Sequence, residues 1–291
     1  KHLTRVRFEQ LKRYIKISNP DEEKIGIEQK RDGDTTQKLW YNKVEPLFSF
    51  VLKTSQKLYN PGSSLAVDEV MIRFTGRSQD TYRIQNKPIN TGYKIVAICG
   101  DPGYTINAIP VSRSRKDHVK EIQIENMRIT ESIVVNLIES VAENRNGVTL
   151  YCDNYYSTIK MFSYLRKKNI AAVGTCKHNQ VTPSIKKQTE KLKKSAPWGT
   201  IITDVKDDVL VAAWQDNTWV SMLTTAHSGS EKVIKSRRRP RTTSSNSKTT
   251  RKMFGEHARK ELPIPKFIED YNKNMGYVDI ADQLRSYYCC M

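Results

Sequence analysis

The chain has 291 residues, 37% of them hydrophobic and 27% charged, which is enough for one large or two small domains with a sizeable core. Its 49 Lys and Arg residues against 31 Asp and Glu give a formal net charge of +18. This charge favours a polyanionic partner, nucleic acid above all, although a merely soluble basic surface is the alternative. The Cys spacing indicates neither a disulfide framework nor a zinc knuckle, and neither a membrane span nor a secretory signal is expected from the apolar runs and the first residues. The five Cys residues are therefore expected to be free, in a reducing cytosol or nucleus, and the abrupt ends at Lys1 and Met291 indicate a fragment.

Two amphipathic helices are predicted before residue 60. Residues 5–17 and 41–58 carry apolar side chains at helical spacing, and Pro61-Gly62 breaks the second pattern. The segment between them, 21–36, is polar and predicted to be a loop.

The pattern changes after Pro61-Gly62. The apolar runs and turn residues predict strands, helices and strands in the order 65–74, 93–99, 105–109 (strands), 119–144 (helix), 148–152 (strand), 157–168 (helix) and 171–174 (strand). Three strands, a helix, a strand, a helix and a strand form a mixed sheet flanked by helices. The predicted class is therefore α/β, in the element order of RNase H-like folds.

The remaining third of the chain is more polar. Residues 177–194 are basic, and 198–225 are predicted to form short antiparallel strands with turns at Asp207-Asp208 and Asp216-Asn217. Residues 232–260 contain S-R-R-R-P-R and almost no acids, so they are predicted to be a flexible basic segment. Two helices, 266–272 and 277–288, complete the prediction.

Four acidic residues are not explained by composition. Asp68 lies inside an apolar strand, Asp153 ends the strand 148–152, and Asp279 and Asp282 share one face of the last helix. Carboxylates converging on one sheet edge repel each other unless a cation such as Mg²⁺ or Mn²⁺ lies between them. Two alternatives remain open, because Asp153 with Asn154 is also a suitable helix cap and Asp279 complements a helix dipole. No cap or turn accounts for Asp68.

Basic residues gather in three places, and phosphate neutralisation or a solvated surface accounts for each. They are Arg77, Arg83, Lys87 and Lys94 around the first two strands, then Lys177 with 186–194, then Arg237, Arg238, Arg239 and Arg241. The run S-R-R-R-P-R is equally a nuclear-import signal. Three tryptophans are candidates for base stacking, although core packing is more common in β-rich segments: Trp198, Trp214 and Trp219.

Five segments, in this order, resemble the piggyBac family of DNA transposases and their domesticated descendants. They are D-E-V-M-I-R-F-T-G-R-S, K-P-I-N-T-G-Y-K, C-D-N-Y-Y-S, V-G-T-C-K-H-N and Y-N-K-N-M-G-Y-V-D-I-A-D-Q. The resemblance is collinear and spans nearly the whole chain, from R-F-E-Q-L-K-R-Y onward.

The resemblance implies an RNase H-like core in which Asp68, Asp153 and Asp279 are the catalytic carboxylates that hold Mg²⁺ or Mn²⁺, with Asp282 assisting. Asn154 would lie close to TTAA target DNA. DNA contacts are also expected at Arg77, Lys87, Lys94, Lys177, Arg237, Arg238 and Arg239.

The resemblance also divides the chain. Residues 1–60 would belong to a helical dimerisation and DNA-binding part, and 61–176 to the first part of the core. Residues 177–262 would form a β-rich insertion domain with the flexible basic segment, and 263–291 the final catalytic helix. A nuclear protein that forms a homodimer when full length is expected.

The sequence departs from the family pattern at three points. Tyr277 stands where the family usually has the second glycine of Gly-Gly-Val-Asp, which adds bulk beside the active-site helix. In G-T-C-K-H-N-Q, Lys177 keeps a charge of the family element and Gln180 loses one. The chain also stops at Met291, before the Cys-rich zinc module that usually closes the family, and Cys289 and Cys290 do not replace that module.

The function implied is metal-dependent DNA cleavage and strand transfer at TTAA sites. Water first nicks the transposon end, and the freed 3′-hydroxyl then attacks another strand through a hairpin intermediate. Two alternatives are a domesticated, non-catalytic DNA-binding protein and an RNase H-like nuclease without transposition. The persistence of all four acids, Asp68, Asp153, Asp279 and Asp282, favours the enzyme.

Overall fold

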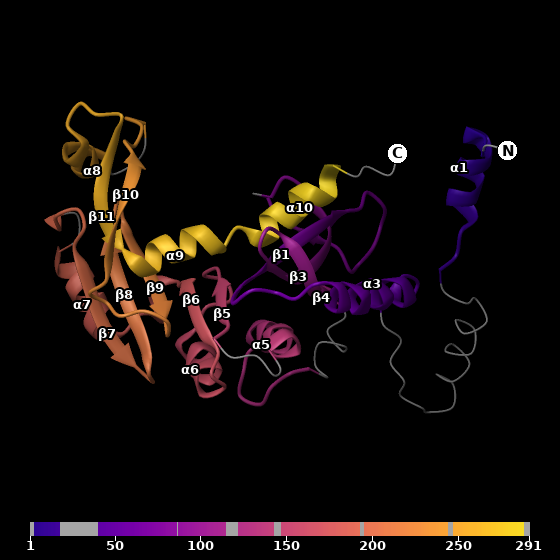
Figure 1. Ribbon diagram of the computed structural model, residues 1–291, viewed down its shortest axis with the longest axis horizontal. Helices are drawn as coiled ribbons and strands as arrows, with labels where there is room; N and C mark the ends of the chain where they lie inside the picture. Colours follow the sequence, from indigo (N-terminus) through magenta and orange to yellow (C-terminus); the bar gives the residue numbers. More distant parts are fainter. Residues whose placement is uncertain are drawn as a thin grey trace. The chain divides into compact units, whose positions relative to one another are not determined.

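The computed structural model describes residues 3–17, 40–85, 87–114, 122–142, 147–192, 195–243 and 247–287 (Figure 1). The described parts of 1–60, 71–94 and 110–121 form one compact unit. Those of 61–70, 95–109 and 122–291 form a second one. No helix in these described ranges is long and apolar enough to cross a membrane.

The first unit contains both predicted N-terminal helices. They are α1, Arg5–Tyr14, and α3, Glu45–Leu58, whose first turn includes a proline. Thr4 caps α1 by accepting a hydrogen bond from the amide of Arg7. Neither helix has a buried residue, so their apolar side chains remain partly or fully exposed. The loop predicted at 21–36 lies outside the described residues.

Aromatic rings pack together in the first unit. The Trp40 ring centroid lies 5.4 Å from that of Tyr93, which in turn lies 4.8 Å from Phe74. The side chain of Asp80 is buried there and accepts a 2.7 Å hydrogen bond from Ser112. Close, tilted ring pairs and a satisfied buried carboxylate are both features of a specifically packed interior.

Nine of the described strands form one sheet in the order β2-β3-β1-β5-β6-β9-β8-β7, with β4 paired to β3, and β10 and β11 form a separate two-stranded sheet. β1, β5 and β6 are mutually parallel, whereas β6 pairs antiparallel with β9. The bounds are β1 Ser64–Arg73, β2 Tyr82–Arg83, β3 Thr91–Gly100, β4 Tyr104–Val111, β5 Thr149–Cys152, β6 Ala171–Thr175, β7 Ile201–Lys206, β8 Val209–Gln215 and β9 Trp219–Thr224. All the predicted strands are present, and within this sheet the two-residue β2 is the strand that the sequence did not indicate.

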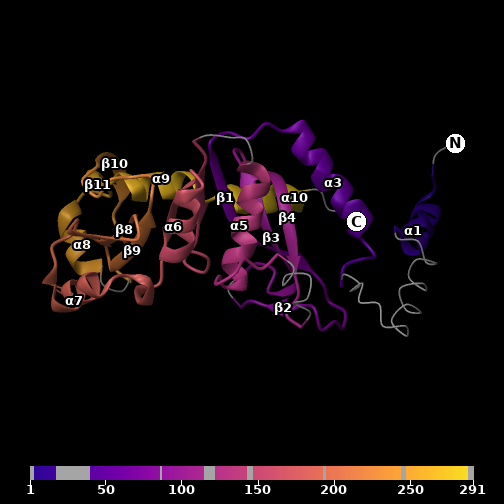
Figure 2. The same cartoon turned by 90° about the horizontal axis from the view of Figure 1, so that it is seen from below.

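Two helices, α5 and α6, cover part of this sheet and lie against each other (Figure 2). α5, Ile129–Ala142, starts ten residues later than its predicted beginning at 119, and residues 122–128 are not helical. The buried Glu131 carboxylate explains the late start, because it accepts bonds from the amide and the guanidinium of Arg128. α6, Ile159–Lys167, begins after Thr158, whose hydroxyl accepts from the amide of Met161.

β7, β8 and β9 are the antiparallel strands predicted within 198–225. The β7–β8 turn consists of Asp207 and Asp208, with φ values of 52° and 61°. Two successive residues with positive φ are typical of the type I′ turn, whose twist matches that of a hairpin. Before β7 lies α7, Pro183–Leu192, a helix that the basic composition of 177–194 did not indicate.

The prediction of a flexible segment at 232–260 is wrong for the described residues. β10, Lys232–Arg238, pairs antiparallel with β11, Arg259–Pro265, along its whole length, and α8, Ser247–Phe254, lies between them. Charge composition predicted solvation, but Arg237 is held by the carboxylate of Asp216 at 2.6 Å. Apolar residues of this segment are also buried: Phe254, Leu262 and Ile264. The basic side chains therefore cover an ordered hairpin.

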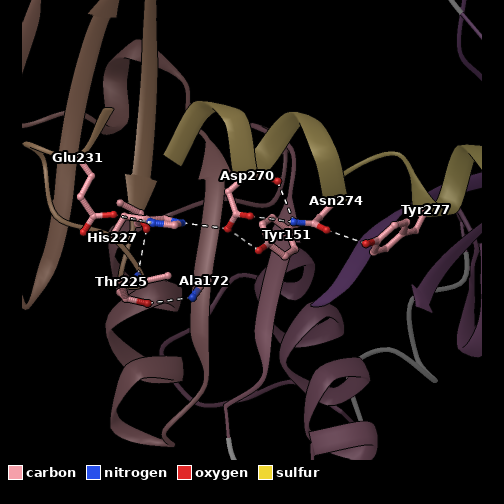
Figure 3. Close-up of polar contacts among 10 residues, drawn as sticks. Tyr151, Ala172, Thr225, His227, Glu231, Asp270, Asn274 and Tyr277 are labelled. Atoms are coloured by element: carbon pink, nitrogen blue, oxygen red, sulfur yellow. Dashed lines mark hydrogen bonds and ion pairs between the residues drawn. The ribbon is translucent and has the colours of Figure 1, made fainter. Parts of the chain in front are cut away.

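The last two helices are α9, Lys266–Asn274, and α10, Tyr277–Tyr287, in agreement with the predictions at 266–272 and 277–288. α9 crosses β5 and β6 at their carboxyl ends (Figure 3). Its Asp270 accepts a bond from Tyr151 of β5, and its Tyr271 hydroxyl lies 3.4 Å from the Thr175 hydroxyl of β6. α10 follows after only two residues.

Candidate active site

Asp68 and Asp153 lie at the same edge of the parallel part of the sheet. β1 pairs with β5 in a register that places Val67 opposite Cys152, and each Asp follows its member of this last pair. Val67 and Cys152 are fully buried, whereas both Asp residues are partly exposed. Because neighbouring strands are about 4.8 Å apart, the two carboxylates start from adjacent backbone positions. An apolar strand thus delivers an acid to the surface.

The local contacts decide between two interpretations of Asp153. Its Oδ1 accepts a 2.9 Å bond from the amide of Tyr155, and its carbonyl oxygen accepts from the Ser157 amide and hydroxyl. These contacts form a tight turn after β5. The cap of α6 is Thr158, so the helix-cap interpretation of Asp153 is wrong.

A third acid, Glu69, contributes to the electrostatics of this edge and was not singled out from the sequence. The hydroxyl of the buried Tyr156 donates a 3.2 Å bond to Glu69 Oε2. Burial raises the pKa of Tyr156 well above its ordinary value, and the charges of Glu69, Asp68 and Asp153 raise it further. The pair D-E in L-A-V-D-E-V was the signal available in the sequence. Within a basic protein, this edge is locally electronegative.

The negative charges at this sheet edge also act on Tyr271 of α9. Burial raises its pKa to about 12, and the negative charges of Asp153 and Asp68 contribute to the shift. Both tyrosines therefore stay neutral and act as hydrogen-bonding groups at physiological pH.

Asp279 and Asp282 lie on α10. Asp279 is exposed in its first turn, directly after the buried Tyr277 and Val278. The helix-dipole interpretation fits this position and stays open. Asp282 forms an ion pair with Arg285 at 2.5 Å, one turn further along the helix.

The β3–β4 turn is in close contact with α10. A Cβ added at Gly103, where φ is +102°, would lie 2.7 Å from Ile280 Cγ2 and 2.9 Å from the Ala281 amide nitrogen. Only glycine accommodates both the backbone angle and this approach. The start of α10 is therefore fixed against the core.

The carboxylates at this sheet edge are the candidate metal ligands. In the described ranges, no group of three or more His, Cys, Asp or Glu residues is placed to hold a metal ion. Asp68 and Asp153 have the hard carboxylate oxygens that Mg²⁺ and Mn²⁺ prefer, and their mutual repulsion favours a cation. The pair fits a divalent metal, but the structure does not bring Asp279 into one group with it. The three-carboxylate site stays a prediction.

Two of the predicted DNA-binding residues lie beside this pair. Asn154 is exposed directly after Asp153, and Lys177 is exposed after the end of β6. The Lys177 ammonium lies 5.6 Å from the ring centroid of Tyr155, a distance typical of a cation–π contact. A positive and a polar group thus accompany the carboxylates on neighbouring strand ends.

The other predicted DNA contacts lie elsewhere. In the first unit, Arg77 is exposed and Lys87 is partly exposed, whereas Lys94 is buried with its ammonium 5.8 Å from the Tyr82 ring centroid. In the second unit, Arg238 is exposed and Arg239 is partly exposed on or beside β10. Arg237 lies over the Trp214 ring at 5.5 Å and pairs with Asp216, so its guanidinium already has protein partners.

Two of the three tryptophans form a packed pair. The centroids of Trp198 and Trp214 lie 5.9 Å apart, edge to face, and Trp214 is only 2% exposed. The Trp198 indole donates a 2.9 Å bond to Asp216. Core packing is therefore the interpretation that fits this pair.

A polar network beside β5 includes residues that sequence analysis missed (Figure 3). Asp270 Oδ2 accepts a 2.7 Å bond from the Tyr151 hydroxyl and lies 3.0 Å from His227 Nε2. Asn274 donates to Asp270 Oδ1 at 3.2 Å and accepts a 2.6 Å bond from the buried Tyr277 hydroxyl. The only sequence signal was an Asp and an Asn four residues apart on a predicted helix. The bulk of Tyr277 is directed into this network.

Comparisons with known proteins identify the family. The family model described as Transposase IS4 matches residues 1–291, which is the whole chain. The human "PiggyBac transposable element-derived protein 2" is 22% identical over 206 residues, which are 66% of this chain and 34% of that protein. The chain therefore spans about a third of the length of this curated relative.

A solved structure has the same fold. The "Cryo-EM structure of piggyBac transposase synaptic complex with hairpin DNA" matches with a TM-score of 0.70 and 21% identity, over 98% of this chain and 51% of that chain. The predicted α/β fold with an RNase H-like mixed sheet is confirmed. The chain belongs to the transposase IS4 family, and its predicted resemblance to piggyBac transposases is confirmed.

Proposed function

We propose that the protein is a piggyBac-type DNA transposase that cleaves and joins DNA at TTAA sites by metal-dependent phosphoryl transfer. The observation that carries this proposal is the parallel register of β1 and β5, which places Asp68 and Asp153 side by side. RNase H-like chemistry needs such a pair, because each metal ion must be held by carboxylate oxygens close to the scissile phosphate.

The residues at the sheet edge would have different roles in the reaction. Asp68 and Asp153 would hold Mg²⁺ or Mn²⁺, with Asp279 completing the ligand set and Asp282 assisting from α10. When bound, the metal would activate a water or 3′-hydroxyl and stabilise the leaving oxygen. The tight turn between Asp153 and Tyr155 keeps the carboxylate in one orientation. Little conformational entropy would therefore be lost when this side chain takes its position in the transition state.

DNA is the proposed partner. Lys177 and Asn154 beside the carboxylates would contact the phosphates and bases next to the scissile bond. Exposed Arg77 and Arg238, with the partly exposed Lys87 and Arg239, would extend the contact along the backbone. The solved relative is a synaptic complex with hairpin DNA, which supports this partner. The full-length protein is proposed to be a nuclear homodimer.

The test is a strand-transfer assay with the full-length protein, Mg²⁺ and TTAA-flanked ends. Asp68→Asn and Asp153→Asn are expected to lower cleavage and joining by at least ~10³-fold, because each removes a metal-binding charge. Asp207→Asn, the same change in the exposed β7–β8 turn, is the matched control and should retain full activity. Equal products from the wild type and both site variants would exclude the catalytic proposal.

The second candidate is a domesticated DNA-binding protein without catalysis. Two observations favour it, namely the human relative described as transposable element-derived and the lack of a three-carboxylate group in the described ranges. It predicts salt-sensitive DNA binding with no products from the wild type in the same assay. Cleavage without joining would indicate an RNase H-like nuclease instead.

A further inference from the structure

α9 contacts β5, the strand that leads to Asp153, and is followed in the chain by α10, the helix that carries Asp279. Its Asp270 carboxylate has a side chain that is 25% exposed, and it is contacted from two directions by Tyr151 of β5 and by His227 after β9 (Figure 3). One turn later, Asn274 is buried and joins Asp270 to Tyr277, the first residue of α10. A continuous chain of hydrogen bonds therefore runs from a central strand to the start of the last helix.

Tyr151 and Tyr277, the two ends of this series of hydrogen bonds, each precede an acidic residue by two positions. Tyr151 lies on β5 and precedes Asp153, the first residue after that strand, by two positions, a span of roughly 7 Å along the chain. Tyr277 precedes Asp279 by two positions in the first turn of α10, a rise of about 3 Å. A displacement of either tyrosine would move the neighbouring carboxylate with it.

The connection between α9 and α10 is short and includes Gly276. A Cβ added at Gly276 would meet nothing within 4 Å, so the space next to this residue is open. The position of the first turn of α10 rests on the burial of Tyr277 and Val278 and on its contact with Gly103. The Tyr277 hydroxyl bond, at 2.6 Å and buried, is the directional part of this support.

We propose that Asp270 and Asn274 are positioning residues that transmit the location of β5 to the first turn of α10, and thereby set Asp279 relative to Asp153. The catalytic part of this inference rests on the proposed function, since it assigns the network a role in aligning those carboxylates. The mechanical part concerns the folded protein alone. The two parts are separable by experiment.

The mechanical part is tested by amide hydrogen exchange in the full-length protein without DNA. Tyr151→Phe removes the β5 hydroxyl that donates to Asp270, a residue of α9 (Figure 3). It is nevertheless expected to speed exchange of amides 280–282 about tenfold, because loss of a buried hydrogen bond allows local opening. Tyr277→Phe and Asp270→Asn should do the same. Tyr164→Phe, which removes a hydroxyl bonded to Glu139 on α5, is the matched control and should leave α10 unchanged.

The catalytic part is tested by kinetics with the same variants. Tyr151→Phe and Tyr277→Phe are each expected to lower kcat about tenfold while KM for DNA stays within about twofold, because alignment acts in the transition state. If both tyrosines act through one network, the double variant should lose little more than the worse single variant.

The results separate the two proposals. Unchanged α10 exchange in Tyr151→Phe overturns the positioning inference, whether or not the wild type is active. Multiplicative losses of kcat in the double variant overturn it as well. Faster α10 exchange together with a wild type that yields no DNA products supports the positioning inference and excludes the proposed catalysis.

Discussion

Cys152 is the last residue of β5, and its side chain is fully buried directly before Asp153. Burial raises the pKa of its thiol from 9.0 to about 12, and the charges of Asp153 and Asp68 contribute. The Ser157 hydroxyl, 3.3 Å from the sulfur, acts in the opposite direction. The folded protein therefore keeps this thiol protonated at a pH where the unfolded chain does not.

This pKa shift predicts a loss of stability in alkali. Because the folded pKa lies above the unfolded value, the contribution is full below about pH 9 and is lost between pH 9 and about 12. Replacing Cys152 with Ala removes the titrating group, so the gap in free energy of unfolding between wild type and variant should narrow by ~1.4 kcal/mol from about pH 8 to about pH 10. Urea titrations at the two pH values measure this gap. A gap that is the same at both would contradict the assignment.

At the residue scale, the sequence predicted the two strand carboxylates better than their contacts. An acid that ends or interrupts an apolar run has few structural explanations, so Asp68 and Asp153 were identifiable. The cap of α6 was not, because Asp153 and Thr158 are both suitable residues and only the turn geometry chooses Thr158. Asp270 was missed because its partners, Tyr151 and His227, are distant in sequence.

At the element scale, the β10–β11 hairpin depends on charges that are only partly solvated. The side chains of Arg237 and Asp216 are 28% and 17% exposed, and the guanidinium also lies over the Trp214 ring. Removing one member of such a pair leaves the other without compensation in a medium of low polarity. The Arg237 guanidinium therefore links β10 to the β8–β9 turn.

This ion pair predicts that replacing two neighbouring arginines with alanine lowers the free energy of unfolding by different amounts. Arg237→Ala is expected to lower the free energy of unfolding by about 2 kcal/mol, since it unpairs Asp216 and uncovers Trp214. Arg238→Ala, at an exposed position on the same strand, should cost less than about 0.5 kcal/mol. Urea unfolding of both variants gives the comparison, and equal costs would show that the ion pair does not anchor β10.

The hairpin also shows what a charge pattern leaves undetermined. Local sequence indicated the strands of 198–225, where apolar residues recur between turns. In 177–194 and 232–260 the basic residues concealed α7, β10 and β11. The two strands depend on partners such as Asp216 and on pairing between segments more than twenty residues apart. Long-range pairing of this kind leaves no local signal.

At the scale of the whole molecule, a net charge of +18 is expected to dominate association with DNA. Not all of these positive charges are available to bind DNA phosphates, since some basic side chains are buried or already contact other residues of the protein. Lys94 is buried over Tyr82, whereas Arg77 and Lys177 are exposed. The available charges should therefore be distinguishable by their effect on salt dependence.

A salt titration makes this distinction. Arg77→Gln and Lys177→Gln are each expected to reduce the slope of log K against log salt by about 1, because each removes one phosphate contact. Lys94→Gln should leave the slope unchanged. Fluorescence anisotropy of a labelled duplex across a series of NaCl concentrations measures the slopes. A reduced slope for Lys94→Gln alone would contradict the division into available and committed charges.

The β7–β8 turn has a practical consequence. Asp207 and Asp208 form an exposed hairpin tip with positive φ, on a strand four places from β5 in the sheet, which is roughly 19 Å at the usual strand spacing. Exposed tips of this kind tolerate inserted sequence, since few buried atoms depend on them. A fluorescent reporter or a programmable DNA-targeting module spliced between these two residues would therefore report on, or redirect, the protein without approaching its carboxylates.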